Sequence, residues 1–313
     1  MKLATVRDGD GLHVAVLTRR TGGAVWVSVA DAALEVLRDE RCPGSLAGLL
    51  GRDGPRLETP RLVAEAAASG PMPRTVRRWR PNEVRFAPPV PQPGSFLDFY
   101  AFEEHVRAAR SKRGLDVPAE WYRHPVYYRS NHRSFIGDGE EALFPAGESQ
   151  MDFELEVAAV LAAPLAGPSA AEAEAAIGGY CLLNDWSARS IQREVMAVGL
   201  GPSKGKDFAT SLGPWLVTPD ELGDLGDLKL SVSVNGQEWS RATLAGMQWR
   251  WGEMISFAGE GVRFEPGDIF GSGTVGGGCG LELGRFLSPG DVVELDGGAP
   301  LGKLVGTVRR REV

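Results

Sequence analysis

Two glutamates, Glu154 and Glu156, lie in a largely apolar run at residues 151–160. Side chains two residues apart on a strand point to the same face, so both carboxylates share one face while Leu155 and Val157 lie on the other. Like charges this close repel each other. A hard divalent cation such as Mg²⁺, Mn²⁺ or Ca²⁺, which carboxylate oxygens bind, relieves that repulsion. The alternative interpretation is an edge strand with a solvated acidic face.

A further carboxylate, Asp185, is predicted at the end of a buried strand. Residues 178–183 are apolar and glycine-rich and end at Asn184-Asp185. Helical spacing follows over residues 186–192, with Ser187 as the predicted N-cap. Strand ends commonly present ligands, so Asp185 is a candidate binding residue.

Two other blocks carry polar residues in short, specific contexts. Asp98 precedes His105 by seven residues, and Lys206 follows a glycine in the run at 201–215. A single helix over residues 95–112 would place Asp98 and His105 two turns apart on one stripe. The aspartate could instead lie in a loop just before the helix. Taken alone, a histidine of this kind is more often structural and a lysine more often a solvated surface charge.

Taken together, these blocks resemble the fumarylacetoacetate hydrolase family. The resemblance runs from about Ser95 to the C-terminus, and its motifs occur in the family's order. Its most specific parts are N-D-W-S-A-R at residues 184–189 with Gln192, and G-P at 201–202 followed by Gly205-Lys206. Residues 127–133 and the short connection after Thr274 depart from the fumarylacetoacetase pattern, so the resemblance does not fix that substrate.

The resemblance implies the roles of thirteen residues. The metal ligands that it implies are Asp98, Glu154, Glu156 and Asp185, with Mg²⁺, Mn²⁺ or Ca²⁺ as the cofactor. The catalytic residues that it implies are His105 as general base, Glu282 as its acidic partner, and Lys206 and Gln192 around the reacting carbonyl. The substrate-contacting residues that it implies are Tyr100, Tyr128, Arg189, Thr210 and Thr274.

The predicted fold is α+β and rich in strands, in two domains. Turn residues separate short strands at 3–7, 12–18 and 24–29, and helical spacing follows at 31–39 and 62–68. The Pro-rich residues 87–94 predict a semi-rigid linker, so we place a smaller N-terminal α/β domain at 1–88 and the catalytic domain at 89–313. Later strands are predicted at 228–234, 264–270 and 292–295. The resemblance implies a mixed β-roll for the catalytic domain, and a homodimer.

Composition excludes several classes of protein. The 313 residues carry a formal net charge of −7, which disfavours nucleic acid as a partner. No apolar run is long enough to span a bilayer and the N-terminus has no signal-peptide core, so we expect a cytoplasmic protein without a membrane partner. Three widely spaced cysteines argue against a disulfide framework and against a zinc site built from cysteines.

Three familiar motifs fail on their context. Residues 201–205 match the G-x-S-x-G elbow of serine hydrolases, but every histidine precedes Ser203, whereas that fold needs its histidine afterwards. Residues 271–276 match a dinucleotide fingerprint, but further glycines stand where its helix must begin. Residues 205–207 lack the flanking residues of a P-loop.

The predicted function is a metal-dependent hydrolase that cleaves a carbon–carbon bond in a β-diketo acid. Acylpyruvates and fumarylacetoacetate-like compounds are the expected substrates, that is, small-molecule keto acids. A 2-oxo-diacid decarboxylase, or a hydroxydienoate isomerase or hydratase, could use the same kind of site. A catalytically silent scaffold protein is the alternative from a different class, and the full acidic set together with Gln192 and Lys206 speaks against it.

Overall fold

The computed structural model describes residues 1–20 and 23–312, and a mostly antiparallel sheet of twelve strands is its main element. The hydrogen-bonded order is β4-β3-β2-β1-β15-β13-β11-β19-β6-β7, with β5 beside β1 and β8 beside β15. These strands are β4 (Arg78–Trp79), β3 (Gly23–Ser28), β2 (Gly11–Arg20), β1 (Lys2–Asp8), β15 (Thr210–Val217), β13 (Ile177–Asn184), β11 (Leu155–Leu161), β19 (Ile269–Gly271), β6 (Phe96–Phe99), β7 (Tyr127–Arg129), β5 (Arg85–Ala87) and β8 (Phe135–Ile136).

A second sheet of five strands packs against the first through the largest apolar core. Its order is β17 (Gln237–Thr243), β16 (Lys229–Val234), β20 (Val292–Asp296), β21 (Lys303–Arg310) and β9 (Glu141–Phe144). Two small sheets pair β10 (Met151–Asp152) with β14 (Ser187–Ala188), and β12 (Leu165–Ala166) with β18 (Arg263–Phe264). This sheet-rich α+β architecture confirms the predicted fold class.

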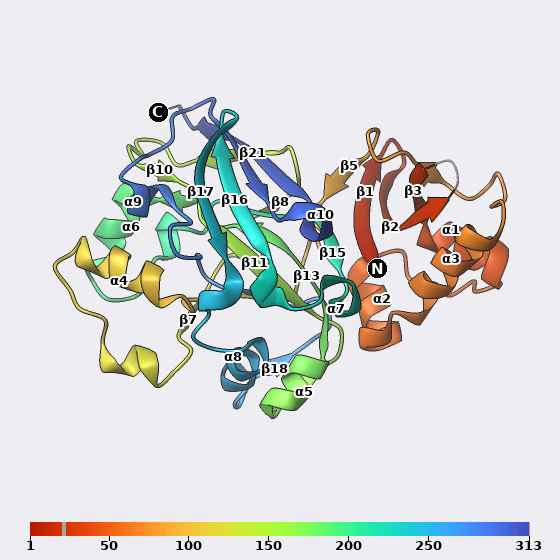
Figure 1. Ribbon diagram of the computed structural model, residues 1–313, viewed down its shortest axis with the longest axis horizontal. Coiled ribbons are helices and arrows are strands. Elements are labelled where there is room, and N and C mark those ends of the chain that lie inside the picture. The colour runs from red at the N-terminus through yellow and green to blue at the C-terminus, as the bar shows by residue number, and fades with distance from the viewer. Residues whose placement is uncertain (21–22, 313) are drawn as a thin grey trace.

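Short helices lie at the ends and faces of the sheets (Figure 1). They are α1 (Val29–Ala32), α2 (Leu46–Asp53), α3 (Glu58–Ser69), α4 (Glu103–Ser111), α5 (Ala170–Ala175), α6 (Arg189–Met196), α7 (Pro219–Leu222), α8 (Trp251–Ala258), α9 (Gly280–Leu283) and α10 (Gly298–Leu301). Figure 1 shows β1–β3 with α1–α3 at one end of the molecule and α4, α6 and α9 at the other. Within the described part of the chain, no helix is long and apolar enough to cross a membrane.

Strand β11 is central and covered on both faces. Leu155 and Val157 belong to the core beneath the five-stranded sheet, whereas Ala158 and Val160 belong to a second core that the N-terminal helices α2 and α3 help to form. Strands covered on both faces are apolar throughout, as β11 is apart from Glu156. The interpretation of this segment as a solvated edge strand is therefore wrong.

The N-terminal segment joins the same sheet. Lys2 and Leu3 of β1 pair with Val217 and Leu216 of β15, and β5 runs antiparallel to β1. The Pro-rich residues 87–94 then lead from β5 into β6. The division into domains at residues 88 and 89 stays a prediction.

Most predicted strands are present, and three local predictions are wrong. The segment predicted as one strand at 264–270 is two strands, because a turn with Gly267 at φ 92° separates β18 from β19. No single helix spans residues 95–112, since Asp98 lies on β6 and α4 begins only at Glu103. Ser187 is not an N-cap: it pairs within β14, and Ala188 precedes the helix.

One ion pair ties the first helical turn to the N-terminal strands and gives a prediction about stability. The Arg77 guanidinium donates to both oxygens of Asp31, at 2.8 Å each. This pairing, stronger than the opposing effect of burial, lowers the pKa of Asp31 from 3.8 to about 2. We expect Asp31→Asn to reduce the free energy of unfolding by about 1–2 kcal/mol at neutral pH.

Because the folded-state pKa is depressed, the contribution is complete above the ordinary pKa and is lost as pH falls towards about 2. Urea unfolding of wild type and Asp31→Asn should therefore differ at pH 7 and converge in acid. Asp10→Asn, an exposed aspartate nearby, is the matched control. A constant difference at all pH values would contradict the assignment.

Candidate active site and metal centre

Three carboxylates from separate strands converge at the centre of the larger sheet. Asp98 lies on β6, Glu156 on β11, and Asp185 directly after β13. One oxygen of each lies within 4.8 Å of the others. Strand β19 lies between β6 and β11. A Cβ at its residue Gly271 would overlap the Asp98 carboxylate, so the glycine lets Asp98 come close to Glu156.

Two buried oxygens of this cluster lack partners. Within the described residues, Glu156 Oε2 and Asp185 Oδ1 accept no hydrogen bond, although both are buried. Burial and the repulsion from neighbouring acids raise the pKa values of Asp98 and Glu156 well above their usual range. Unpaired buried carboxylate oxygens are costly, and a hard divalent cation takes oxygen ligands of this kind. The donor set therefore fits such a cation.

Glu154, the fourth predicted ligand, is held by two cations of the protein itself. Its Oε1 accepts from Arg189 Nη2 at 2.7 Å, and its Oε2 pairs with Lys206 Nζ. Burial favours the protonated acid, but Lys206 and Arg189 outweigh it and lower the pKa of Glu154. The structure thus gathers three of the four predicted ligands, and Glu154 stands beside them, paired with Arg189 and with Lys206, which also bonds Asp185. Its role as a ligand stays a prediction.

Arg189 also pairs with a second acid, Asp152, which the sequence reasoning missed. Asp152 accepts from Arg189 Nε at 2.8 Å and from the Gly280 and Leu281 amides at 2.7 and 2.9 Å. It thereby ties helix α6 to the start of α9. The signal was present in the chain, because Asp152 precedes Glu154 by two residues and so continues the alternating acidic pattern.

Helix α6, which carries Arg189 and Gln192, is anchored by a second buried acid without a predicted role. Glu148 is fully buried and accepts from the amides of Ser190 and Ile191 at 3.2 Å each. These are free amides of the first helical turn, so Glu148 satisfies groups that the helix itself leaves unpaired. The sequence offered no distinguishing signal for it, because Glu148 lies in a loop forty residues upstream of the helix.

Lys206 and Gln192, both predicted near the reacting carbonyl, lie on adjoining elements. Gly205 makes this possible, because a Cβ there would overlap Gln192. Lys206 Nζ donates to Asp185 Oδ2 at 2.6 Å as well as to Glu154, and these two acids raise its pKa against the effect of burial. Gln192 Oε1 accepts from Arg189 Nη1 at 3.0 Å, so its NH₂ group is the end available to a ligand.

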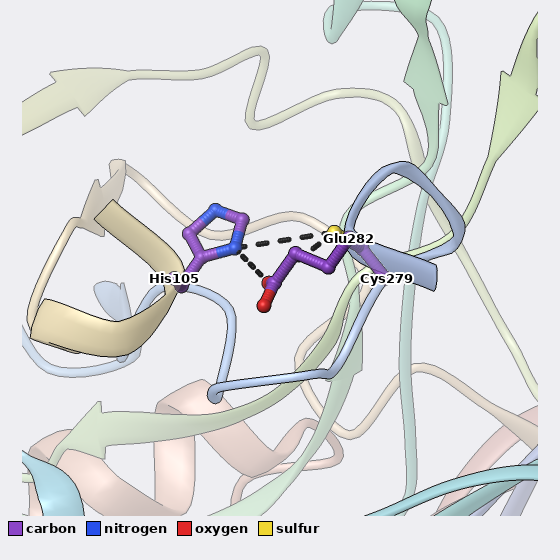
Figure 2. Close-up of side chains that lie close together, drawn as sticks. All are labelled: His105, Cys279 and Glu282. Atoms are coloured by element: carbon purple, nitrogen blue, oxygen red, sulfur yellow. Dashed lines mark hydrogen bonds and ion pairs between the residues drawn. The ribbon is translucent and has the colours of Figure 1, made fainter. Parts of the chain in front are cut away.

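His105 and Glu282 form a buried pair, as the resemblance implied. Figure 2 shows His105 Nδ1 facing Glu282 Oε1, while the other ring nitrogen points away. Glu282 Oε2 accepts from the Gly277 amide at 2.8 Å, which fixes the carboxylate. Burial raises the pKa of Glu282, but the bond to His105 outweighs it and the net shift is downwards. The Tyr100 ring stands edge-on to the imidazole, with centroids 5.4 Å apart.

The histidine pair adjoins the carboxylate cluster through the backbone. Glu154 forms a β-bridge with Cys279, and the Leu155 amide donates to Gly278 at 2.9 Å. The segment that leads into α9, the helix that carries Glu282, is therefore attached to the start of β11. Cys279 itself, which sequence reasoning considered only as one of three cysteines, lies beside both His105 and Glu282 (Figure 2).

The other predicted substrate contacts surround the carboxylates. The Tyr128 hydroxyl donates to Asp185 Oδ2, and burial together with Asp185 raises the pKa of that phenol well above its usual range. Thr274 Oγ1 lies 3.4 Å from Glu156 Oε1. Thr210 is buried on β15, and its hydroxyl has no hydrogen-bond partner within the described residues. Burial and Glu154 raise the pKa of Tyr100 to about 12.

Comparison with known proteins places the chain in a family. Residues 95–309 match the family described as "Fumarylacetoacetate (FAA) hydrolase C-terminal". The protein belongs to this family, whose members typically use a divalent metal ion and include hydrolases. The predicted resemblance and its extent are confirmed.

Individual relatives carry different activities in their names. The 2,4-didehydro-3-deoxy-L-rhamnonate hydrolase of Sphingomonas sp. (strain SKA58) is 31% identical over 217 residues, 68% of this chain and 73% of that protein. The structure of 2-hydroxyhepta-2,4-diene-1,7-dioate isomerase from Mycobacterium marinum covers 100% of both chains with a TM-score of 0.70 at 22% identity. That of maleylpyruvate hydrolase from Sphingobium sp. SYK-6 has a TM-score of 0.72 at 19% identity, covering 99% and 100% of the two chains. At these identities the two structures show the shared fold alone.

The unpaired carboxylates predict cation binding that depends on Glu156. Isothermal titration with Mn²⁺ should show one site in wild type, and Glu156→Gln should weaken binding by at least about 10-fold because one anionic ligand is lost. Glu141→Gln, an exposed glutamate, is the control and should bind as wild type does. Equal affinity of wild type and Glu156→Gln would show that the cluster holds no cation.

The buried position of Arg189 between two acids predicts a large effect on stability. Arg189→Ala leaves the buried Asp152 without its cation and Glu154 with Lys206 alone, so the free energy of unfolding should fall by about 3–5 kcal/mol. Arg189→Lys should recover only part of this lost free energy, because one ammonium group cannot replace the planar guanidinium that bonds both acids. Urea unfolding in chelator measures this, with exposed Arg193→Ala on the same helix as control. A change below about 0.5 kcal/mol for Arg189→Ala would contradict it.

Proposed function

We propose that the protein is a divalent-cation-dependent hydrolase that cleaves a carbon–carbon bond in a small β-diketo acid, such as an acylpyruvate or a fumarylacetoacetate-like compound. The observation that carries the proposal is the buried pair of His105 and Glu282 beside three convergent carboxylates. A positioned imidazole is the group needed to activate water, and the carboxylates supply a place for a cation. The relative that is named a hydrolase at 31% identity supports this choice.

The residues divide the chemistry among them. Asp98, Glu156 and Asp185 would hold Mg²⁺, Mn²⁺ or Ca²⁺, which supplies Lewis-acid polarisation of the substrate's keto oxygens. Thr274 contacts Glu156 and Tyr128 contacts Asp185, so both lie at the edge of this cluster and would orient the bound keto acid. The carboxylates and Thr274 are buried, and this burial strengthens each electrostatic contact among them.

His105 acts as the general base in this proposal. Glu282 accepts the Nδ1–H bond, so Nε2 carries the free electron pair and can take a proton from water. Glu282 also stabilises the imidazolium that forms, and its own orientation is held by the Gly277 amide. The oxygen of the activated water then forms a bond to the carbonyl carbon.

Lys206 and Gln192 stabilise the oxyanion that this attack creates. Two N–H groups of Lys206 donate to Glu154 and Asp185 Oδ2, and the third makes only a long contact of 3.5 Å with the Asp185 carbonyl, which a substrate oxygen would replace. The Gln192 NH₂ group is the second donor. When the alkoxide collapses, the carbon–carbon bond breaks, one fragment leaves as a carboxylic acid, and the His105 imidazolium returns its proton to the carbon fragment.

Decarboxylation of a 2-oxo diacid and isomerisation or hydration of a hydroxydienoate stay open as outcomes of the test. They would use the same carboxylate cluster, but decarboxylation and isomerisation do not require a base that activates water. The homodimer and the cytoplasmic location stay predictions of the family resemblance and the sequence, respectively.

The role of His105 can be tested on two classes of substrate with one variant. His105→Ala should lower kcat for a β-diketo acid by about 10²–10⁴-fold, the usual contribution of a positioned base. Its Mn²⁺ affinity should stay close to that of wild type, since the imidazole is outside the carboxylate set. Loss of the enol absorbance of acylpyruvates measures the rate, with and without chelator.

His124→Ala is the matched control, because that histidine is exposed and stacks on Phe257 away from the carboxylates. It should hydrolyse the substrate as wild type does. If His105→Ala retains the wild-type rate of hydrolysis, His105 is not the base. If wild type turns over only oxaloacetate-like or hydroxydienoate substrates, the proposed hydrolysis is wrong and one of the alternative reactions takes its place.

A further inference from the structure

We propose that His105, Cys279 and Glu282 form a second metal site, which binds a borderline-soft divalent cation such as Zn²⁺ and inhibits the enzyme when occupied. The three side chains come from α4, from the loop before α9 and from α9 itself. One ligand atom of each lies within 4.8 Å of the others, in a cluster separate from the three carboxylates. The binding stands apart from the proposed function, whereas the inhibition rests on it.

The distances suit a tetrahedral ion. Cys279 Sγ lies 3.5 Å from Glu282 Oε1 and 3.9 Å from His105 Nδ1 (Figure 2). Zinc bonds of about 2.0–2.3 Å at tetrahedral angles separate neighbouring ligand atoms by about 3.4–3.6 Å. Two edges of the coordination triangle are therefore close to the required length. Only the third, between His105 and Glu282, has to lengthen from a hydrogen bond to a ligand–ligand contact.

A nucleophilic triad of these three residues does not fit the geometry. Such a triad needs the thiol at one ring nitrogen and the acid at the other. Here Cys279 and Glu282 both face Nδ1, and Nε2 points away from both (Figure 2). The arrangement has three potential ligands around one common point, which is what a metal site requires.

The chemistry of the ligands separates this site from the carboxylate cluster. A thiolate, an imidazole nitrogen and one carboxylate oxygen favour Zn²⁺, whereas an all-oxygen set favours Mg²⁺, Mn²⁺ or Ca²⁺. On binding, the Cys279 S–H bond breaks and its proton goes to solvent, the His105 Nδ1 proton moves through solvent to Nε2, and sulfur–metal and nitrogen–metal bonds form with no change in oxidation state. The two sites can therefore hold different ions at the same time.

A groove comes close to the site. A groove of ≈ 1020 Å³ over the five-stranded sheet is lined by Glu104, Gly276 and Gly277 among others. The Gly277 amide donates directly to Glu282, so the groove ends one peptide group from a ligand. An ion at this position would take both Nδ1 and the carboxylate that orients the ring, and so would remove the base from catalysis.

The test uses Co²⁺ as a spectroscopic probe on the full chain, with Mg²⁺ saturating the carboxylate cluster. Wild type should develop a thiolate-to-Co²⁺ charge-transfer band that saturates at one equivalent and disappears when Zn²⁺ is added. Cys279→Ser and Cys279→Ala should lack the band. Cys42→Ser should keep it, because that half-buried thiol lies elsewhere.

A variant that retains Cys279 as its only thiol guards against misfolding of the Cys279 variants. Cys42→Ser/Cys181→Ser should show the same band as wild type. In the hydrolase assay, the Zn²⁺ concentration that halves the rate should rise by at least about 10-fold in Cys279→Ser relative to wild type. Each protein is compared with its own zinc-free rate.

Two results would overturn the proposal: no charge-transfer band in wild type, or a band that persists in folded Cys279→Ser. A band that is lost in Cys42→Ser would place the bound metal at that cysteine and would also overturn it. The spectroscopic readout needs no substrate, so it can succeed or fail independently of the hydrolase assay. A band with no effect of Zn²⁺ on the rate would retain the site and reject the inhibition.

Discussion

The imbalance of buried charge at the centre of the larger sheet governs the site. Asp98, Glu156 and Asp185 lie close together there, with Glu154 beside them, and Lys206 and Arg189 are the cations that face these acids. Both cations pair with Glu154, so Asp98 and Glu156 keep raised pKa values. Because buried like charges repel each other, these acids favour the binding of whatever neutralises them, either protons or a cation. The surrounding structure maintains this imbalance.

The scaffold keeps the acids close by burying their strands on both faces. Side chains of β11 alternate between two apolar cores, so the strand cannot rotate to expose Glu156 without exposing one of them. Gly271 and Gly205 then remove the side chains that would hold neighbouring elements apart. Arg189 of α6, itself held by Asp152, pairs with Glu154 beside these acids. Rigid strands and paired charges, rather than flexible loops, therefore set the geometry.

The histidine pair depends on a different kind of support. Helix α4 supplies His105, and α9 supplies Glu282, and both are short elements at the end of the molecule away from the N-terminal strands (Figure 1). The bridge between Glu154 and Cys279 connects this region to β11. The proton-transfer groups and the carboxylates consequently share one backbone connection, which fixes their separation. The same connection brings a thiol beside the imidazole.

The sequence by itself determined the fold class and the family, because these follow from motifs and from local periodicity, and it predicted most of the residues that the structure brings together at the site. It also predicted that Glu154 and Glu156 share a face, since alternation on a strand is a local property. Tertiary structure alone decided that Arg189 and Lys206 pair with Glu154, that Lys206 also pairs with Asp185, and that Asp185 lies together with Asp98 and Glu156. It also decided that Cys279 adjoins His105, 174 residues earlier in the chain. Such pairings depend on which strands and loops meet in space, and no spacing within the chain encodes that meeting.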